Sequence, residues 1–175
     1  MGLGQTMLTI MALVLMGRLV LSFNTTILET GFTKDMAEYR ITATSLGTSM
    51  LEQSSGLAFD ERTVDSTAGT TAALTSKASF GPDATESNVD RYDDIDDYHN
   101  YSKIDSLTNS AIFKTRVTVN YVDISGSDVV TTASKTFSKE VIVDVTSDFL
   151  VDYSVSPARP DTLRFKQIFS YWYFR

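Results

Sequence analysis

Residues 3–53 decide the fold, and they read LGQTMLTIMALVLMGRLVLSFNTTILETGFTKDMAEYRITATSLGTSMLEQ. No proline precedes Pro82, so nothing in this stretch breaks the backbone hydrogen bonds of a helix. Ser54, Ser55 and Gly56 follow as a stop signal. We therefore predict a helix from near Leu3 to about Gln53. With a rise of about 1.5 Å per residue it would be about 75 Å long, more than a compact domain of this size can bury.

The first half of this helix is apolar enough to cross a membrane. Residues 1–17 carry no ionisable side chain, and after Arg18 the next charged residue is Glu29. A run of about 20 apolar residues is what the hydrocarbon core of a bilayer requires. Arg18 would lie about 25 Å along the helix, where its long side chain can reach the far interface. Residues 1–28 are therefore predicted to be covered by lipid or by copies of the same chain.

The sequence of residues 1–28 leaves open two other interpretations, one of the function of this segment and one of its continuity as a helix. A cleaved secretory signal is the first, but no Lys or Arg precedes the apolar run, and Ser22-Phe23-Asn24 is a poor cleavage site. The second concerns continuity, because glycine and β-branched or Asx-type residues between Gly17 and Gly31 have low helix propensity. A bent or melted stretch there and a continuous helix are both compatible with the sequence.

The second half of the helix, residues 29–56, is amphipathic. Apolar residues recur every three or four positions, which places them on one helical face, with charged residues on the others. We predict that this face packs on the rest of the chain, and its members are Leu28, Phe32, Met36, Tyr39, Ala43, Leu46 and Met50.

Composition excludes several function classes. The 175 residues contain 15 Lys and Arg against 22 Asp and Glu, a net charge of −7, whereas nucleic-acid binding needs a basic face. The absence of cysteine excludes disulfides, thiolate metal sites and a Cys nucleophile, and a single histidine, His99, excludes multi-histidine metal sites. Nucleophile-elbow and glycine-rich phosphate motifs are also lacking. We expect a protein that is not an enzyme and requires no cofactor, with His99 as a surface residue.

Residues 57–175 are predicted to form a β-rich head. Residues 112–123 and 139–146 alternate between apolar and polar side chains, the pattern of strands with one buried face. Further strands are expected at residues 129–137 and 163–174, with Pro157 and Pro160 in the loop before the last one. A sheet of roughly four antiparallel strands needs a cover, and the amphipathic half of the long helix can provide it. The predicted fold class is α+β.

Asp93, Asp94, Asp96 and Asp97 are the main candidates for metal ligands, because carboxylate oxygens suit Ca²⁺. The EF-hand spacing is absent, and the default interpretation is an acidic loop that is solvated or contacts another subunit. Asn100, in Asn100-Tyr101-Ser102, matches the N-glycosylation acceptor pattern.

A long helix with an apolar first half, followed by an antiparallel β domain, resembles the type IV pilin family. The resemblance implies that a prepilin peptidase creates the mature N-terminus, which would be a methylated Met1. It also places Gln5 where pilins usually carry a glutamate that pairs with the N-terminal amine of a neighbour. An amide cannot neutralise an ammonium, so Gln5 departs from the family pattern. Archaeal pilins and archaellins share the same architecture and are a second resemblance.

A shorter resemblance lies in the acidic segment. Residues 93–98 read DDIDDY, which is similar to a DDVDDY segment of minor pilins of the mannose-sensitive haemagglutinin pilus. The match covers only six residues, most of them acidic, so it supports the family resemblance but is not sufficient to establish it.

Together these features predict a structural subunit that polymerises into an extracellular type IV pilus-like filament. The partners implied are the chain itself, the pilus assembly machinery with its prepilin peptidase, and the cytoplasmic membrane before assembly. Two alternatives remain open: a pseudopilin or minor pilin of a secretion or DNA-uptake machine, and a membrane-anchored binding domain with a single transmembrane pass. The residues expected to mediate assembly are Met1, Gln5, Leu8, Met11, Leu13, Leu15, Arg18 and Leu21.

Overall fold

The computed structural model of the chain describes residues 2–106, 111–126 and 128–174. Its contacts divide the chain into an N-terminal unit, Met1–Arg40, and a β unit, Ile41–Arg175. The predicted helix is present as α1 (Leu3–Ser55), which continues through the segment between Gly17 and Gly31 without a break. It ends one residue before Gly56, as the stop signal indicates.

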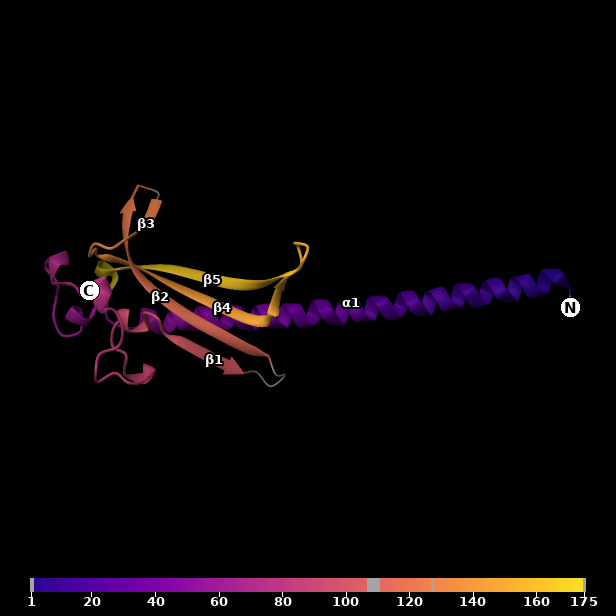
Figure 1. Cartoon of the computed structure of the whole chain (residues 1–175), viewed down its shortest axis with the longest axis horizontal. Coiled ribbons are helices and arrows are strands. Elements are labelled where there is room, and N and C mark those ends of the chain that lie inside the picture. Colours follow the sequence, from indigo (N-terminus) through magenta and orange to yellow (C-terminus); the bar gives the residue numbers. More distant parts are fainter. Residues whose placement is uncertain (1, 107–110, 127, 175) are drawn as a thin grey trace. The chain divides into compact units, whose positions relative to one another are not determined.

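The β unit contains a five-stranded antiparallel sheet, one strand more than predicted (Figure 1). The strand order is β1-β2-β4-β5, and β3 pairs with the far end of β2. The fold class is α+β, as expected from the sequence. The strands are β1 (Ser102–Ser106), β2 (Ile112–Ser125), β3 (Asp128–Thr132), β4 (Ser138–Asp152) and β5 (Arg159–Ser170).

The two central strands follow the predicted alternation. Val117 of β2 lies opposite Val143 of β4, and Val143 lies opposite Phe165 of β5. Val117 and Val143 are fully buried, whereas Lys114 and Arg116 of β2 are exposed on the opposite face. One face of the sheet therefore forms the core and the other faces solvent.

The last part of α1 covers the apolar face within the β unit. Ala43, Gly47, Met50, Leu51 and Ser54 are buried there. The predicted packing face is thus correct for Ala43 and Met50, and Leu46 beside them is half-buried. The approach is closest at Gly47, where a Cβ atom would lie 2.3 Å from Cδ2 of Phe165.

This close approach gives a prediction for Gly47. Gly47→Leu is expected to lower the free energy of unfolding by about 2–3 kcal/mol, because the side chain would displace the Phe165 ring from a packed core. Denaturant unfolding of the full chain in detergent, followed by circular dichroism of the sheet, measures the effect. The matched control is Gly31→Leu, since no atom lies within 4 Å of the corresponding position. Equal stability of the two variants would contradict this packing.

Three strand boundaries differ from the prediction, for identifiable reasons. Pro160 lies inside β5 rather than in a loop, which an edge strand tolerates because one side of it needs no donor. The third strand ends at Thr132, and Lys135 beyond it donates hydrogen bonds to the carbonyls of Ala72 and Leu74. The last strand ends at Ser170 and continues as a 3₁₀-helix, η6 (Tyr171–Phe174), rather than as strand.

Residues 57–101 contain no strand and are organised around a small core. The segment folds into short 3₁₀-helices: η1 (Glu61–Thr63), η2 (Thr71–Ala73), η3 (Lys77–Ser79), η4 (Val89–Arg91) and η5 (Asp96–Tyr98). Its apolar side chains join Tyr121 of β2 and Tyr171 of η6 in one buried cluster that contains Phe59, Ala68 and Leu74. The Tyr171 hydroxyl also accepts a hydrogen bond from the amide of Ala68 at 2.9 Å. The loop is therefore fixed to the sheet by packing and side-chain hydrogen bonds.

Candidate functional site

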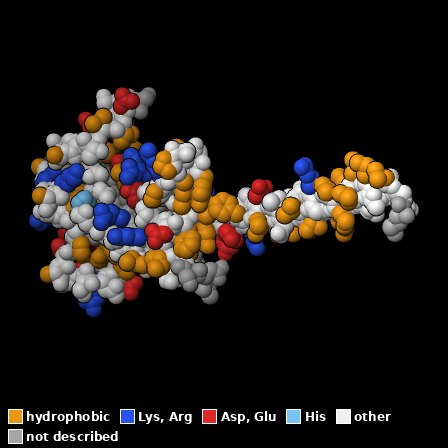
Figure 2. Space-filling model, turned by 45° about the vertical axis from the view of Figure 1, so that its right-hand side comes forward, with side chains coloured by type: hydrophobic (Ala, Val, Ile, Leu, Met, Phe, Trp, Pro, Cys, Tyr) orange, Lys and Arg blue, Asp and Glu red, His pale blue; other side chains and the backbone are white. Residues whose placement is uncertain are grey.

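The N-terminal unit carries the first candidate site, an apolar surface along α1 (Figure 2). Among the described residues, this helix is the one long and apolar enough to cross a membrane. Of the predicted assembly residues, Gln5, Leu8, Met11, Leu13, Leu15, Arg18 and Leu21 are helical and exposed. Met1 lies outside the described residues.

The residues of the predicted packing face fall into two groups along α1, one exposed or half-buried and one mostly buried. Leu28 and Phe32 are exposed, with 67% and 49% of their surface accessible, and Met36 and Tyr39 are half-buried. All four belong to the N-terminal unit, whereas the buried members Ala43 and Met50 belong to the β unit. The apolar surface of α1 therefore extends at least to Phe32.

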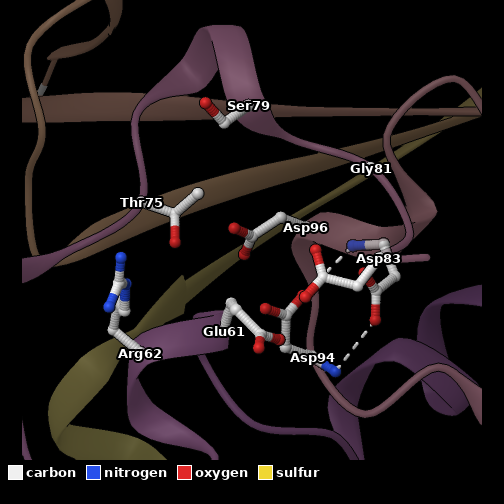
Figure 3. Close-up of a pocket in the computed structure, with 9 residues that line it drawn as sticks. Glu61, Arg62, Thr75, Ser79, Gly81, Asp83, Asp94 and Asp96 are labelled. Carbon is white, nitrogen blue, oxygen red and sulfur yellow. Dashed lines mark hydrogen bonds between the residues drawn. The ribbon is translucent and has the colours of Figure 1, made fainter. Parts of the chain in front are cut away.

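The second candidate site is an acidic pocket in the β unit (Figure 3). It has a volume of about 280 Å³, and residues from η1, η3, η5 and the loops between them line it. We use the name acidic cluster for the carboxylates in and around it, which are Glu61, Asp83, Glu86, Asp93, Asp94 and Asp97.

The four predicted metal ligands are not a solvated loop, so that interpretation is wrong. Asp94, Asp96 and Asp97 are at most 3% exposed, and only Asp93 reaches solvent. Backbone hydrogen bonds hold the segment: the amide of Ala58 donates to the carbonyl of Asp93 at 2.9 Å. The carboxylates of Asp94 and Asp97 accept hydrogen bonds from each other's amides, at 3.1 and 3.3 Å. Because the other three aspartates are buried, Asp93 is the one of the four that can contact another subunit directly.

Asp96 pairs with a buried lysine that the sequence reasoning missed. Lys139 of β4 is fully buried, and its ammonium donates to the carboxylates of Asp60 and Asp96 and to the carbonyl of Phe59. Asp60 also accepts from the amide and hydroxyl of Thr75. Burial alone would raise the pKa of Asp60, but the Lys139 charge and these hydrogen bonds lower it below its ordinary value. Asp96 therefore belongs to a buried ion triad, and its role as a metal ligand stays a prediction.

The acidic cluster has no such buried partner, although the exposed Arg62 also lines the pocket. Within the described residues, none of its six carboxylates forms a salt bridge with Lys or Arg. Burial, together with the charges of Asp96 and Asp97, raises the pKa of Asp94 to about 9. Burial, with a contribution from Glu86, also raises the pKa of Asp97 to about 7. The pocket thus concentrates carboxyl groups that have no salt-bridge partner and that hold protons more tightly than usual.

These shifts predict an unusual pH dependence of stability. Asp94 and Asp97 bind protons more tightly in the folded chain than in the unfolded chain, so proton uptake stabilises the fold as the pH falls from about 9 towards 5. Asp60 and His99 act in the opposite sense because their pKa values are lowered: the contribution of His99 is lost below about pH 6.5 and that of Asp60 below about pH 4. We expect the Tm, measured in EDTA, to be about 5 °C or more higher at pH 5.5 than at pH 8.5. A Tm that rises with pH over this range would contradict it.

His99 and Asn100 have different environments. His99 is half-buried rather than on the surface, and its Nδ1 accepts a hydrogen bond from the amide of Val119 at 3.2 Å. Burial lowers the pKa of His99, so the imidazole is neutral and has a structural role. Asn100 is exposed and has a positive φ of 66°, a conformation that asparagine tolerates in turns. Its glycosylation stays a prediction.

Comparisons with protein-family models, with curated proteins and with solved structures found no match to this chain. The resemblance to pilins therefore stays a prediction from the sequence.

Proposed function

We propose that the chain is a structural subunit that polymerises through its N-terminal helix into an extracellular type IV pilus-like filament. Before assembly the same helix would anchor the subunit in the cytoplasmic membrane. The observation that carries the proposal is the extent of apolar surface on the N-terminal unit. The exposed large apolar side chains up to residue 28 are Leu3, Met7, Leu8, Ile10, Met11, Leu13, Val14, Leu15, Met16, Leu19, Val20, Leu21, Phe23, Ile27 and Leu28.

The distribution of these side chains supports burial on all sides of the helix. Leu13, Val14, Leu15 and Met16 are consecutive, so they point in four directions around the axis, and all are exposed. A helix that docks on one partner needs a single apolar stripe, whereas one that is apolar all round belongs in lipid or inside a bundle. Burial of each large side chain contributes on the order of 1.5–3 kcal/mol. A bilayer and a bundle of identical helices would satisfy the same surface.

The threonine hydroxyls of this segment are already hydrogen-bonded within the helix. The hydroxyls of Thr6 and Thr9 donate to the carbonyls of Leu3 and Gln5 in the preceding turn of the helix. Thr26 donates in the same way to the carbonyl of Ser22. Such bonds satisfy hydroxyl donors that would otherwise lose water on burial. The segment can therefore pass from lipid into a bundle without exposing unpaired threonine hydroxyls.

Helices related by a rotation that does not close form an open fibre, which is how repeated contacts between identical subunits yield a filament. A pseudopilin or minor pilin would use the same helix in a shorter assembly. A monomeric membrane-anchored binding domain would use it for anchoring alone. Enzymatic activity and nucleic-acid binding are not part of the proposal.

Removal of detergent from the purified full chain tests the proposal. We expect filaments of uniform diameter that sediment and are visible by negative-stain electron microscopy. Addition of lipid vesicles before detergent removal provides the comparison, because the anchored form should then float with the vesicles. A water-soluble monomer after detergent removal would contradict both assembly and anchoring. Vesicle-bound monomers that never form fibres would favour the membrane-anchored binding domain.

A further inference from the structure

The acidic cluster brings together carboxylates from three separate loop segments. Glu61 comes from η1, Asp83 and Glu86 from the loop before η4, and Asp93, Asp94 and Asp97 from the segment around η5. Two triads have carboxylate oxygens within 4.8 Å of one another. They are Glu61–Asp93–Asp94 and Glu86–Asp93–Asp97, so Asp93 is common to both.

The closeness of these carboxyl groups favours a shared positive species. Glu61, Asp93 and Asp94 offer carboxylate oxygens within 4.8 Å of one another, and so do Glu86, Asp93 and Asp97. Ionised carboxylates repel at such distances, and a shared cation relieves the repulsion. Lys139 cannot supply the charge, because Asp60, Asp96 and the Phe59 carbonyl already occupy its ammonium. Arg62 also lines the pocket, but among the described residues it forms no salt bridge with the cluster.

Asp94 provides the independent observation that points to a ligand. Its side chain lines the pocket beside Glu61 (Figure 3), and the residue is only 1% exposed. Its Oδ1 accepts a hydrogen bond from the Asp97 amide at 3.1 Å, whereas its Oδ2 is buried without any partner. A buried carboxylate oxygen without a partner costs stability, so a native structure that keeps one needs a compensating interaction.

The backbone holds Asp94 in place independently of any ligand. Ala58 and Asp94 form an isolated parallel β-bridge, and the amide of Ile95 donates to the carbonyl of Ala58 at 3.0 Å. The unpartnered oxygen therefore has a fixed position, and binding there does not require the segment to fold first.

We propose that the acidic cluster is a calcium site in which Glu61, Asp93 and Asp94 bind the ion and Glu86 and Asp97 complete its coordination. All the candidate ligands are carboxylate oxygens, which suits a hard cation and not zinc or copper. Ca²⁺ accepts six to eight oxygens in irregular geometry, whereas Mg²⁺ demands a small and nearly octahedral arrangement. A pocket of about 280 Å³ with ligands from three loops fits the larger ion and several waters.

Bound calcium would tie together a segment that has no strand of its own. Residues 57–98 are held by the apolar cluster, the ion triad and single hydrogen bonds, and the ion would add a link between η1, the loop at Asp83–Glu86 and η5. The site lies entirely within the β unit, so the inference does not depend on polymerisation.

Calorimetry and thermal unfolding of the full chain in detergent test the proposal. After treatment with EDTA and buffer exchange, titration with CaCl₂ should give one binding event with a Kd between about 0.1 and 1 mM, as in extracellular calcium modules. Saturating calcium should raise the Tm by about 5 °C or more at pH 7.5, and the same concentration of MgCl₂ should raise it far less. No calorimetric signal, or equal effects of the two ions, would overturn the assignment.

The variant Asp94→Asn distinguishes two roles of Asp94, that of a calcium ligand and that of a residue needed only for the fold. The variant should bind calcium at least about tenfold more weakly. In EDTA it should be about as stable as the wild type, because the neutral amide keeps a carbonyl oxygen that can accept the hydrogen bond from the Asp97 amide. Glu61→Gln provides a second variant at a less buried position, and Asp90→Asn is the matched control, since Asp90 is exposed and outside the cluster. Calcium responses that are unchanged in both cluster variants would overturn the proposal.

Discussion

Leu13→Asp is expected to abolish filament formation completely while leaving the β unit folded. Leu13 lies in the middle of the apolar surface, and 69% of it is exposed. A carboxylate near the centre of a membrane helix costs about 2.5–3.5 kcal/mol on insertion scales. In a bundle that cost recurs in every subunit, and like charges on neighbouring helices also repel each other. Sedimentation and electron microscopy after detergent removal measure the loss.

The control for this variant is Leu13→Met, which keeps the volume and apolar character and should assemble as the wild type does. Near-ultraviolet circular dichroism in detergent reports whether the β unit keeps its packing, because its buried aromatic residues include Phe59, Tyr121 and Tyr171. Leu13→Asp filaments in normal yield would show that this part of the helix is not buried in the assembly.

Lys139→Met is expected to produce the largest loss of stability among single substitutions in the β unit, about 3–5 kcal/mol. The Lys139 ammonium pairs with two buried carboxylates, Asp60 and Asp96. It also lies over the rings of Phe59 and Tyr121, at 4.6 and 5.3 Å from their centroids. Methionine fills similar space but leaves the two carboxylates buried and uncompensated. Denaturant unfolding in detergent at pH 7.5 measures the difference.

Lys103→Met is the matched control, because Lys103 pairs with Asp105 at 2.8 Å but is 49% exposed. The control should change stability by less than about 1 kcal/mol. Adding Asp96→Asn to Lys139→Met should recover part of the loss, since one buried charge is then removed. A small effect of Lys139→Met, comparable with the control, would mean that the triad is hydrated rather than buried.

The long helix and the central strands could be predicted because their signals are local. The absence of proline and the stop at Gly56 determine α1, which extends only two residues beyond the predicted end at Gln53. Alternation of polar and apolar residues identifies β2 and β4, whose inward residues include Val117 and Val143. Both patterns follow from side-chain periodicity, which needs no knowledge of distant partners.

The edges of the sheet were harder to predict because the conformation of their residues depends on contacts with residues distant in the sequence. The strand β1 reads SKIDS and has a single apolar residue, so it lacks the alternation of a half-buried strand. It forms because its backbone pairs with β2, from Ser102–Arg116 to Ser106–Ile112. At the other end, Tyr171 leaves the strand direction because its ring stacks on Phe137 in the loop core.

The candidate site was predicted in part. The DDIDDY segment was identified as a possible cation ligand set, but Glu61 and Glu86 were missed because only the folded loop brings them to Asp93. Lys139 carried a usable signal, because it shares the alternation of Val141, Val143 and Val145 and so points inward with them. A lysine on the buried face of a strand requires a buried acidic partner. The sequence therefore predicts that such a partner exists, but it does not identify Asp60 or Asp96 as that partner.

A helical reconstruction of the assembled filaments by electron cryomicroscopy tests the central claim most directly. Our account predicts a core built from residues 3–28 of many copies, with the helices in mutual contact and the side chains of Leu13 and its apolar neighbours shielded from water. The contrary result would be fibres held together by edge-to-edge pairing of β1 and β5, with the N-terminal helices outside the core.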